Sequence, residues 1–261
     1  MKGFEMSATS TIKLNVLIRL VLLVSAFVLT GCATNIDANP RDPWEPMNRK
    51  IFEVNDSVDK AVVRPVAVAY KDYTPDLAQK GIHNFFGNLR DVWSAVNSVF
   101  QLKVNQTAEL TGRVLVNTTV GVLGFIDVAT PLNLNKHKED FGKTLGYWGG
   151  PSGPYVVLPF FGPSTLRDAS GFVVDVKFNP TSSQIKKVRV RNSLYVINAI
   201  DVRRGLLGLE DNLNSIALDR YSFIRDAYLQ RRLYEIYDGN PPDTEDSDES
   251  EETGESTDSG K

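Results

Sequence analysis

Cysteine and histidine are almost absent from this chain of 261 residues, which contains one cysteine, Cys32, and two histidines, His83 and His137. A single cysteine excludes a disulfide within the chain, and two isolated histidines do not form the ligand cluster of a metal site. The chain also lacks a Walker motif and a Gly-x-Gly-x-x-Gly fingerprint. The closest approach to a nucleophile elbow, at residues 150–154, has the wrong spacing. These absences predict a protein with no catalytic residues, no metal and no cofactor.

Positive charge is not in excess either, because the formal net charge is −3. Residues 239–261 hold nine Asp or Glu, one Lys and no large apolar residue, which is the composition of a disordered acidic tail. Without this tail and the first 31 residues, the chain has 25 Lys or Arg and 22 Asp or Glu. A balance of about +3 suits an anionic membrane surface but gives no reason to expect nucleic acid as a partner.

The N-terminus has the pattern of a bacterial lipoprotein signal. Basic residues precede an apolar run at residues 20–29, which is too short to span a bilayer easily and which leads into Leu-Thr-Gly-Cys ending at Cys32. We predict a signal peptide at residues 1–31, lipidation of Cys32 and a lipidated tether at residues 32–42. The alternative is an ordinary signal peptide with an incidental cysteine. Several acyl chains would hold the protein stably on its membrane, and Ala33 resembles the sorting signal for the outer membrane.

Two amphipathic helices dominate the first half of the mature chain. Thr74, as a cap, and Pro75 predict the start of a helix that runs to about residue 100, with apolar residues at every third or fourth position. A second helix is expected at residues 104–123, and its second half carries no charge. The pair predicts an apolar hairpin that either sinks part-way into a membrane or forms a buried core.

The remaining helical signals are weaker. Residues 43–64 have helical spacing, and Pro65 is expected to end or kink that helix. Ser164 is a candidate cap for a helix up to about residue 177, and residues 183–191 fit a helix or a strand. A last helix is predicted at residues 217–237, whose arginines either contact phosphates or form its solvated side.

The stretch from residue 141 to residue 168 is rich in glycine, proline and apolar residues at once. Six glycines and four prolines argue against regular structure through most of it, yet a solvent-exposed loop is normally more polar. We therefore expect an irregular segment with a special surface. It could be a buried crossover, a partner-binding face or a lip that contacts the membrane.

Several sequence motifs resemble those of the MlaA (VacJ) outer-membrane lipoproteins. They are DPWEPMNR at 42–49, VRPVA at 63–67, NFFGNL at 84–89, GFIDVA at 124–129, FGKTLG at 141–146, GPYVVLPF at 153–160 and TLRD at 165–168. The resemblance covers residues 42–236 in the family's order, and the basic run at residues 186–191 matches it poorly.

The resemblance implies a mainly α-helical, ring-like body at residues 43–238, embedded in the inner leaflet of the outer membrane. It implies an amphipathic pore that takes mislocalised phospholipid from the outer leaflet and passes it to a periplasmic lipid carrier, with a trimeric porin as neighbour. The candidate pore or lip residues, all in the glycine- and proline-rich stretch, are Gly142, Gly146, Trp148, Gly153, Pro154, Pro159, Phe160, Arg167 and Asp168. We expect Arg167 to lie inside the body.

Two other functions fit the same residues less well. A lipid hydrolase would need a serine activated by His83 or His137. A passive structural lipoprotein associated with porins would need no pore. The resemblance therefore implies an outer-membrane lipoprotein, anchored on the periplasmic side, that maintains lipid asymmetry.

Overall fold

A computed structural model describes residues 39–216 and 218–242, of which those from Arg41 onward belong to one compact unit. The predicted signal peptide, Cys32 and residues 243–261 of the acidic tail lie outside the described residues. The described part is mainly α-helical. Its elements are α2 (Glu45–Val58), η1 (Asp59–Val63), α3 (Arg64–Tyr73), α4 (Asp76–Phe100), α5 (Val104–Thr119), η2 (Thr130–Leu132), α6 (Phe141–Tyr147), β1 (Tyr155–Leu158), β2 (Gly162–Thr165), α7 (Leu166–Phe178), α8 (Pro180–Gln184), α9 (Val188–Ile216) and α10 (Arg220–Ile236).

Helices α2 and α3 form one continuous arm, the α2–α3 arm. It does not end at Pro65, which was one of the two outcomes expected from the sequence. A π-helical turn, η1, joins α2 to α3, and Pro65 lies in the first turn of α3. Proline has no N–H to donate, so it is tolerated in a first helical turn. The wider π turn, in which the Arg64 N–H donates to the carbonyl of Asp59, lets the chain continue as a helix to Tyr73.

Helix α4 begins at Asp76, one residue after the predicted first position at Pro75. No side chain caps its N-terminus, so the predicted cap by Thr74 is wrong. The carbonyl of Thr74 instead accepts a hydrogen bond from the Gln79 amide. The side of α4 that is buried is largely polar and includes Asn88, Asp91 and Asn97. The apolar stripe is less well covered, and Val99 and Phe100 are exposed.

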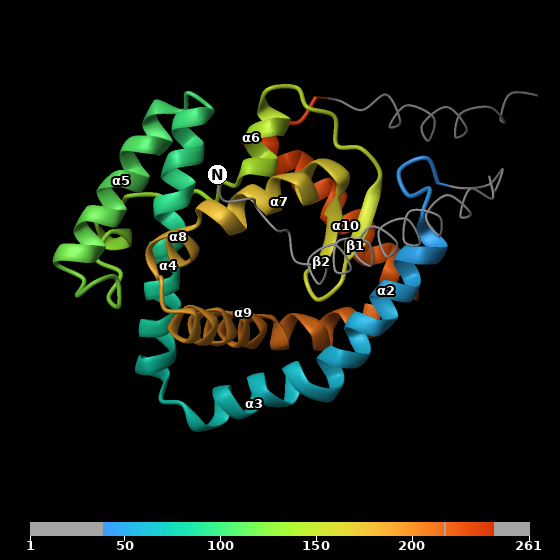
Figure 1. The fold of residues 1–261 in the computed structure, drawn as a ribbon, viewed down its shortest axis with the longest axis horizontal. Coiled ribbons are helices and arrows are strands. Elements are labelled where there is room, and N and C mark those ends of the chain that lie inside the picture. The colour runs from blue at the N-terminus through green and yellow to red at the C-terminus, as the bar shows by residue number, and fades with distance from the viewer. Residues whose placement is uncertain (1–38, 217, 243–261) are drawn as a thin grey trace, which may run out of the picture. The chain divides into compact units, whose positions relative to one another are not determined.

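Helix α5 packs antiparallel against α4 (Figure 1). Like α4, it buries polar side chains and exposes apolar ones. Its buried residues are Leu110, Arg113 and Asn117, whereas Leu115 is exposed. The turn after α5 carries further exposed apolar residues, which include Val122, Leu123 and Ile126. The predicted hairpin is therefore present, with polar groups between its helices and apolar groups on its outside.

The expectation of an irregular segment at residues 141–168 is wrong. It contains α6 and an antiparallel hairpin of β1 and β2, in which Tyr155 pairs with Thr165 and Leu158 with Gly162. Both strands are only four residues long, and β2 itself begins with Gly162 and Pro163, so the glycines and prolines did not prevent a short hairpin. Tyr155 and Val157 are buried and, with Tyr221 of α10, form a small core against α2.

The later helices agree with the sequence except at their ends. The side chain of Thr165, not that of Ser164, caps α7 by accepting a hydrogen bond from the Asp168 N–H. Asn179 ends α7 and caps α8, and the ambiguous residues before 192 lead into α9, a helix. No helix among the described residues is long and apolar enough to cross a membrane.

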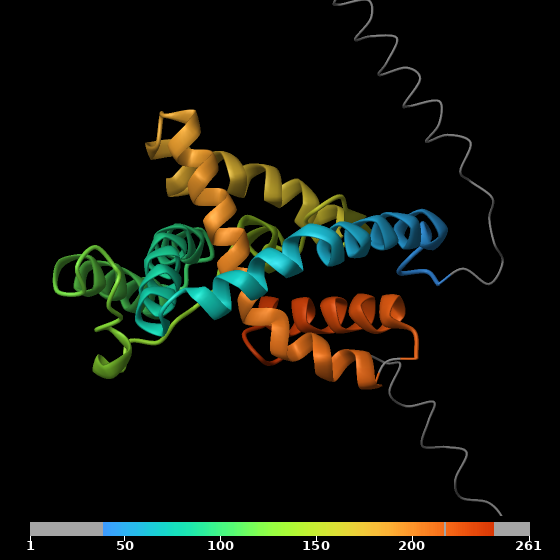
Figure 2. The same ribbon diagram turned by 90° about the horizontal axis from the view of Figure 1, so that it is seen from below.

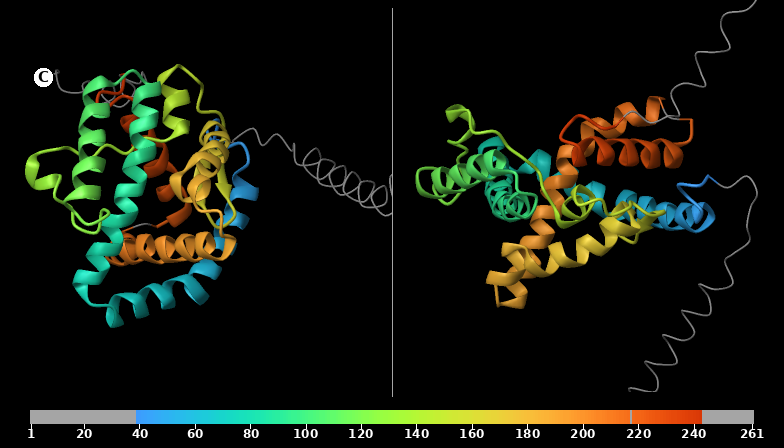
Figure 3. Two further views of the ribbon diagram at one scale, coloured as in Figure 1. Left: turned by 60° about the vertical axis from the view of Figure 1, so that its left-hand side comes forward. Right: turned by 90° about the horizontal axis from the view of Figure 1, so that it is seen from above.

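Helices α4, α7, α9 and α10 lie around a central region in Figure 1. Viewed from below, α9 crosses the α2–α3 arm and joins the side that carries α7 and α8 to the side that carries α10 (Figure 2). The two further views confirm that α10 and α7 lie on opposite sides of this arm (Figure 3). The arrangement leaves α4, α6, α7 and α10 facing one another across the region that holds the candidate site.

Candidate functional site

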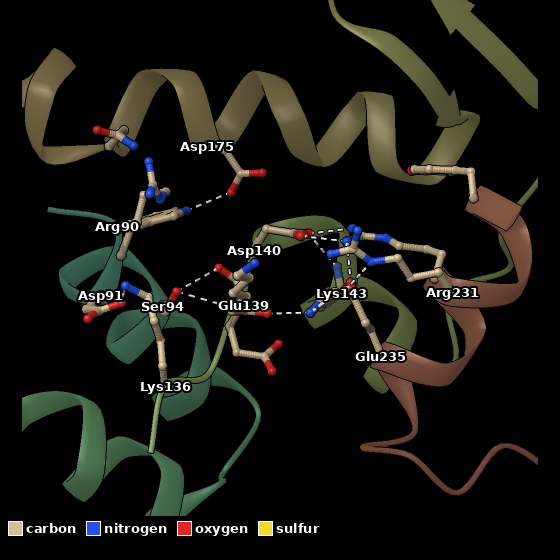
Figure 4. Close-up of a pocket in the computed structure, with 15 residues that line it drawn as sticks. Arg90, Asp91, Ser94, Lys136, Glu139, Asp140, Lys143, Asp175, Arg231 and Glu235 are labelled. Carbon is tan, nitrogen blue, oxygen red and sulfur yellow. Dashed lines mark hydrogen bonds and ion pairs between the residues drawn. The ribbon is translucent and has the colours of Figure 1, made fainter. Parts of the chain in front are cut away.

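A charged pocket of about 440 Å³ lies between α4, the loop before α6, α6, α7 and α10 (Figure 4). Its cationic lining residues are Arg90, Lys136, Lys138, Lys143, Arg231 and Arg232. Its acidic lining residues are Asp91, Glu139, Asp140, Asp175 and Glu235. A cavity with both signs of charge replaces hydration for a polar or ionic group, which would otherwise lose several kcal/mol on leaving water.

Arg232 of α10 organises one side of the pocket. Its guanidinium donates to Asp140 Oδ2 at 2.6 Å and to Asp168 Oδ2 at 2.9 Å. Burial alone would raise the pKa of both carboxyls, but the charge and hydrogen bonds of Arg232 outweigh it and hold both pKa values below the usual range. Tyr228 also donates to Asp168, at 2.8 Å. On this side of the pocket, the charge of Arg232 is therefore balanced by two carboxylates of the protein.

Lys143 of α6 is compensated as well. Its Nζ lies 3.1 Å from Glu235 of α10 and also donates to the carbonyl of Lys138. Next to it, Glu139 accepts a hydrogen bond from Gln101 at 2.9 Å, and its N–H donates to the hydroxyl of Ser94. These contacts fix the loop before α6 against α4.

Asp175 of α7 faces the pocket from above in Figure 4. Its Oδ1 accepts hydrogen bonds from the indole N–H of Trp93, at 2.7 Å, and from the N–H of Phe141. Burial raises the pKa of Asp175, although both hydrogen bonds oppose the rise and Asp140 adds to it. The carboxylate is therefore less stable in its charged form than those bound to Arg232.

The predicted site residues fall into three groups, and none of them lines the pocket directly. Gly142, Gly146, Arg167 and Asp168 pack where α6, α7 and α10 meet: a Cβ on Gly142 would lie 2.7 Å from Asp168 Oδ1, and one on Gly146 would lie 2.9 Å from Arg167 Nη1. Arg167 is inside the body, as expected, with a side chain 8% exposed that donates to Asp168 and to the Gly150 carbonyl.

The second group belongs to the β1–β2 hairpin and its approach. Gly153 has a positive φ of 67°, and Pro154 accepts a backbone hydrogen bond from Leu166. Pro159 and Phe160 form the tip, where Phe160 is exposed and has a positive φ of 66°. The third group is Trp148, which ends α6; its ring is exposed and its indole N–H donates to the Phe100 carbonyl.

Sequence reasoning did not identify the residues that line the pocket. They come from five separate segments, and no spacing in the sequence brings Arg90, Lys136 and Arg232 together. The arginines of the last helix were the one available signal, because the sequence left open whether they contact phosphates or water. The structure places Arg231 and Arg232 at the pocket, Arg225 in a buried cluster with Asp42, and Arg220 against Asp56.

The histidines do not support catalysis. His83 Nδ1 lies 2.8 Å from Asp201, and His137 Nε2 lies 2.5 Å from Glu109. Both imidazoles thus pair with carboxylates, and neither is hydrogen-bonded to a serine within residues 39–216 and 218–242. The same residues contain no group of His, Cys, Asp and Glu that could hold a metal ion.

Comparisons with known proteins identify the family. The family model for the MlaA lipoprotein matches residues 40–235. The intermembrane phospholipid transport system lipoproteins MlaA of Shigella flexneri and Escherichia coli (strain K12) are each 38% identical over 216 residues, which covers 80% of this chain and 85% of the relative. The Haemophilus influenzae lipoprotein of the same name is 30% identical, over 87% of this chain and 94% of the relative.

A solved structure agrees with these relatives. It was described as the structural basis for maintenance of bacterial outer membrane lipid asymmetry, and it resembles this chain with a TM-score of 0.66 and 35% identity. The match covers 75% of this chain and 98% of the other. Since the family model spans residues 40–235, this protein belongs to the MlaA lipoprotein family.

Proposed function

We propose that the charged pocket is the path by which this protein takes phospholipid headgroups out of the outer leaflet of the outer membrane. As a member of the MlaA family, the protein is an intermembrane phospholipid-transport lipoprotein that maintains outer-membrane lipid asymmetry, and it is not an enzyme. The proposal adds the route through the body. It also places the protein as an acylated, periplasmic-side component of the outer membrane.

The observation that carries the proposal is a charged cavity in a body that exposes many large apolar residues on its surface. Moving a phospholipid between leaflets is slow because its charged headgroup must cross hydrocarbon, which costs many kcal/mol without compensation. The ionic groups of the pocket replace that lost hydration. Exposed apolar residues on α5 and its turn, such as Leu115, Val122 and Leu123, would meet the acyl chains.

We further propose that the body is a ring lodged in the inner leaflet, with residues 141–168 contributing to its lip. Trp148, Phe160 and Phe161 support this placement because these residues are 62%, 75% and 67% exposed. Aromatic residues favour the membrane interface, where one edge of the ring meets apolar chains and the other meets water. The alternative of a wholly buried crossover finds no support in this exposure.

Transport of lipid from the outer membrane into the periplasm requires an acceptor, and the body needs a holder in the membrane. We propose that a trimeric porin holds the body in the outer membrane and that a soluble periplasmic carrier receives the lipid. Neither step needs a nucleotide at this protein, because a downstream component can supply the drive. The lipid anchor on Cys32 keeps the body at the membrane through several acyl chains.

Complementation tests the proposal. In a strain that lacks the gene, outer-leaflet phospholipid is measured by its access to an amine-reactive reagent that does not cross the membrane. The full-length protein should restore a low level. The variant Lys138→Trp, which places a large ring at the pocket, should restore it poorly, whereas Lys80→Trp, at an exposed site of α4 outside the pocket, should behave as the wild type.

The same strain separates transport from a passive scaffold. Porin recovered with each variant is measured in parallel. If Lys138→Trp loses lipid asymmetry while it retains porin, the scaffold function is excluded. If the strain without the gene has normal outer-leaflet phospholipid, the transport function itself fails.

A further inference from the structure

The α4 side of the pocket has more positive charge than its carboxylates can balance. Asp91 is shared: Arg113 Nε lies 3.2 Å from its Oδ2, and Lys136 Nζ lies 3.4 Å from its Oδ1. Arg113 takes further compensation from Asp127, at 3.2 Å. Arg90, the neighbour of Asp91, has no carboxylate at salt-bridge distance within the described part of the chain and donates to the amide oxygen of Asn198 at 3.0 Å. Arg90 and Lys136 are therefore undercompensated.

The opposite wall differs. There Arg232 binds two carboxylates, and Lys143 and Arg231 share Glu235. Those cations are held by protein groups and have little charge to offer a ligand. Lys138 lines the pocket too, but it lies at an exposed position of the loop before α6. On the α4 side, the undercompensated charge is therefore that of Arg90 and Lys136, which Figure 4 shows on the same side of the pocket.

The position of Lys136 is built into the fold. A Cβ on Gly87 would lie 2.8 Å from Lys136 Nζ, so the absence of a side chain at Gly87 leaves room for the ammonium against α4. Gly87 and Asp91 are four residues apart and therefore share a face of the helix. Asn198 of α9 likewise fixes Arg90. The two cations are held in place by neutral or shared partners.

The pKa shifts of Arg90 and Lys136 agree with their lack of full compensation by carboxylates. Burial lowers the pKa of Arg90, against the opposing charges of Asp91 and Asp201. Burial also lowers the pKa of Lys136, and repulsion from Arg90 and Arg113 adds to the effect. An anion between the two side chains would reverse both shifts.

We propose that Arg90 and Lys136 form a subsite for the phosphate of a phospholipid headgroup. The inference rests on the proposed function, because it assigns the ligand group within the same pocket. A guanidinium binds phosphate through a planar pair of N–H groups, and an ammonium adds a compact point charge. The acyl chains would extend from this subsite toward the pocket opening.

Binding to the purified full-length lipoprotein in a non-ionic detergent tests the subsite. Calorimetric titrations compare dihexanoyl phosphatidylethanolamine, dihexanoylglycerol, which lacks the phosphate, and inorganic phosphate. The wild type should bind the phospholipid more tightly than the other two. Arg90→Gln and Lys136→Gln should each weaken phospholipid binding about tenfold, as expected for a lost charge-assisted hydrogen bond, and should reduce its dependence on salt.

Three controls make the result specific. Lys80→Gln removes an exposed cation from the same helix and should bind as the wild type. Arg90→Lys keeps the charge and should recover part of the affinity. Circular dichroism of each variant reports whether the helices have formed, and the weakened binding should occur with unchanged helix content.

Several outcomes would overturn the subsite. Wild-type affinity in the double variant Arg90→Gln/Lys136→Gln would do so, as would equal binding of dihexanoylglycerol. Inorganic phosphate bound as tightly as the phospholipid would mean a free-phosphate site instead. If the double variant binds normally while the wild type restores lipid asymmetry in cells, only the subsite fails. If the wild type does not restore asymmetry, the proposed function fails.

Discussion

The guanidinium of Arg113 lies 3.2 Å from the carboxylate of Asp91, and both side chains are 2% exposed. This pair lies inside the α4–α5 hairpin, while Val99 and Leu115 face outward. A helix in water buries its apolar side. The reverse arrangement suits a hairpin whose surroundings are hydrocarbon, where ionisable groups face the interior of the protein and pair with one another.

Arg113→Met should destabilise the hairpin strongly. The change leaves Asp91 and Asp127 without their shared cation, and breaking a buried ion pair on one side costs about 3–5 kcal/mol. Denaturant unfolding in detergent, followed by circular dichroism, measures the loss. Arg189→Met, at an exposed position of α9, is the matched control and should change the free energy of unfolding little. Equal stability of the two variants would contradict the structural role of Arg113.

Gly171→Ala should destabilise the contact between α6 and α7. A Cβ at Gly171 would lie 2.5 Å from the backbone nitrogen of Gly142, and a backbone neighbour cannot rotate away. Overpacking of this kind costs about 1–3 kcal/mol. Gly205→Ala is the opposite case, because nothing lies within 4 Å of its Cβ and it is inside α9, so it should stabilise by about 0.5–1 kcal/mol. Thermal unfolding of both variants would reveal whether the two signs differ.

Asn55→Ala should loosen the tip of the β1–β2 hairpin. The Asn55 amide donates to the Leu158 carbonyl at 2.9 Å and accepts from the Phe160 N–H at 2.8 Å. These bonds hold Phe160 at a positive φ, which is strained for a residue with a bulky side chain. Loss of two hydrogen bonds should cost about 1–3 kcal/mol and should speed amide hydrogen exchange across residues 155–165.

Two further variants check that explanation. Ser57→Ala, on the same helix, removes only a local hydrogen bond to Glu53 and should leave exchange in the hairpin unchanged. Phe160→Gly removes the strain and should partly compensate for Asn55→Ala. Unchanged exchange at the tip in Asn55→Ala would mean that β1 and β2 hold Phe160 without Asn55.

The sequence was sufficient for the helices with strong periodicity and for their pairing. Pro75 and Asp76 set the start of α4, and the two apolar patterns predicted the hairpin. It was not sufficient to decide which side of the hairpin faces inward, because a periodic apolar stripe fits a buried core and a lipid contact equally. Only the three-dimensional positions of Asp91 and Arg113 separate these cases.

Neither the β1–β2 hairpin nor the pocket could be predicted from the sequence, and the physical reasons differ. Pro159 directly follows β1, and Gly162 is the first residue of β2. Because each strand has only four residues, the alternation of buried Tyr155 and Val157 is too short to predict a strand. The pocket is formed by long-range packing. Arg90 and Arg232 are brought to it by α4 and α10, which are far apart in the sequence, and periodicity within one helix cannot report such a contact.

Acid should weaken the turn after α5 through Asp127. Burial alone would raise the pKa of Asp127, but hydrogen bonds from Thr130 and Asn117 and the charge of Arg113 outweigh it and lower the pKa from 3.8 to about 2. A depressed pKa means stability that is present above pH 4 and lost as the pH falls toward about 2. At about 1.4 kcal/mol for each pKa unit, the full shift corresponds to about 2.5 kcal/mol. Because Asp127 is partly exposed, solvent screening reduces the contribution to about 1–2 kcal/mol.

Asp127→Asn isolates this effect. The difference in the free energy of unfolding between wild type and variant should be largest near neutral pH and should shrink between about pH 4 and about pH 2. Unfolding titrations at several pH values measure it. A difference that grows on acidification would have the wrong sign for a carboxylate stabilised in its charged form.

The path of the lipid through the pocket is tested most directly by photo-crosslinking in cells. A photoreactive amino acid at position 138, which lines the pocket, is compared with one at position 80, an exposed charged site outside it. After irradiation, the purified protein is analysed by mass spectrometry for attached lipid. Our account predicts a phospholipid adduct at position 138 and little or none at position 80. Absence of phospholipid at position 138, with wild-type lipid asymmetry maintained by that same variant, would contradict it.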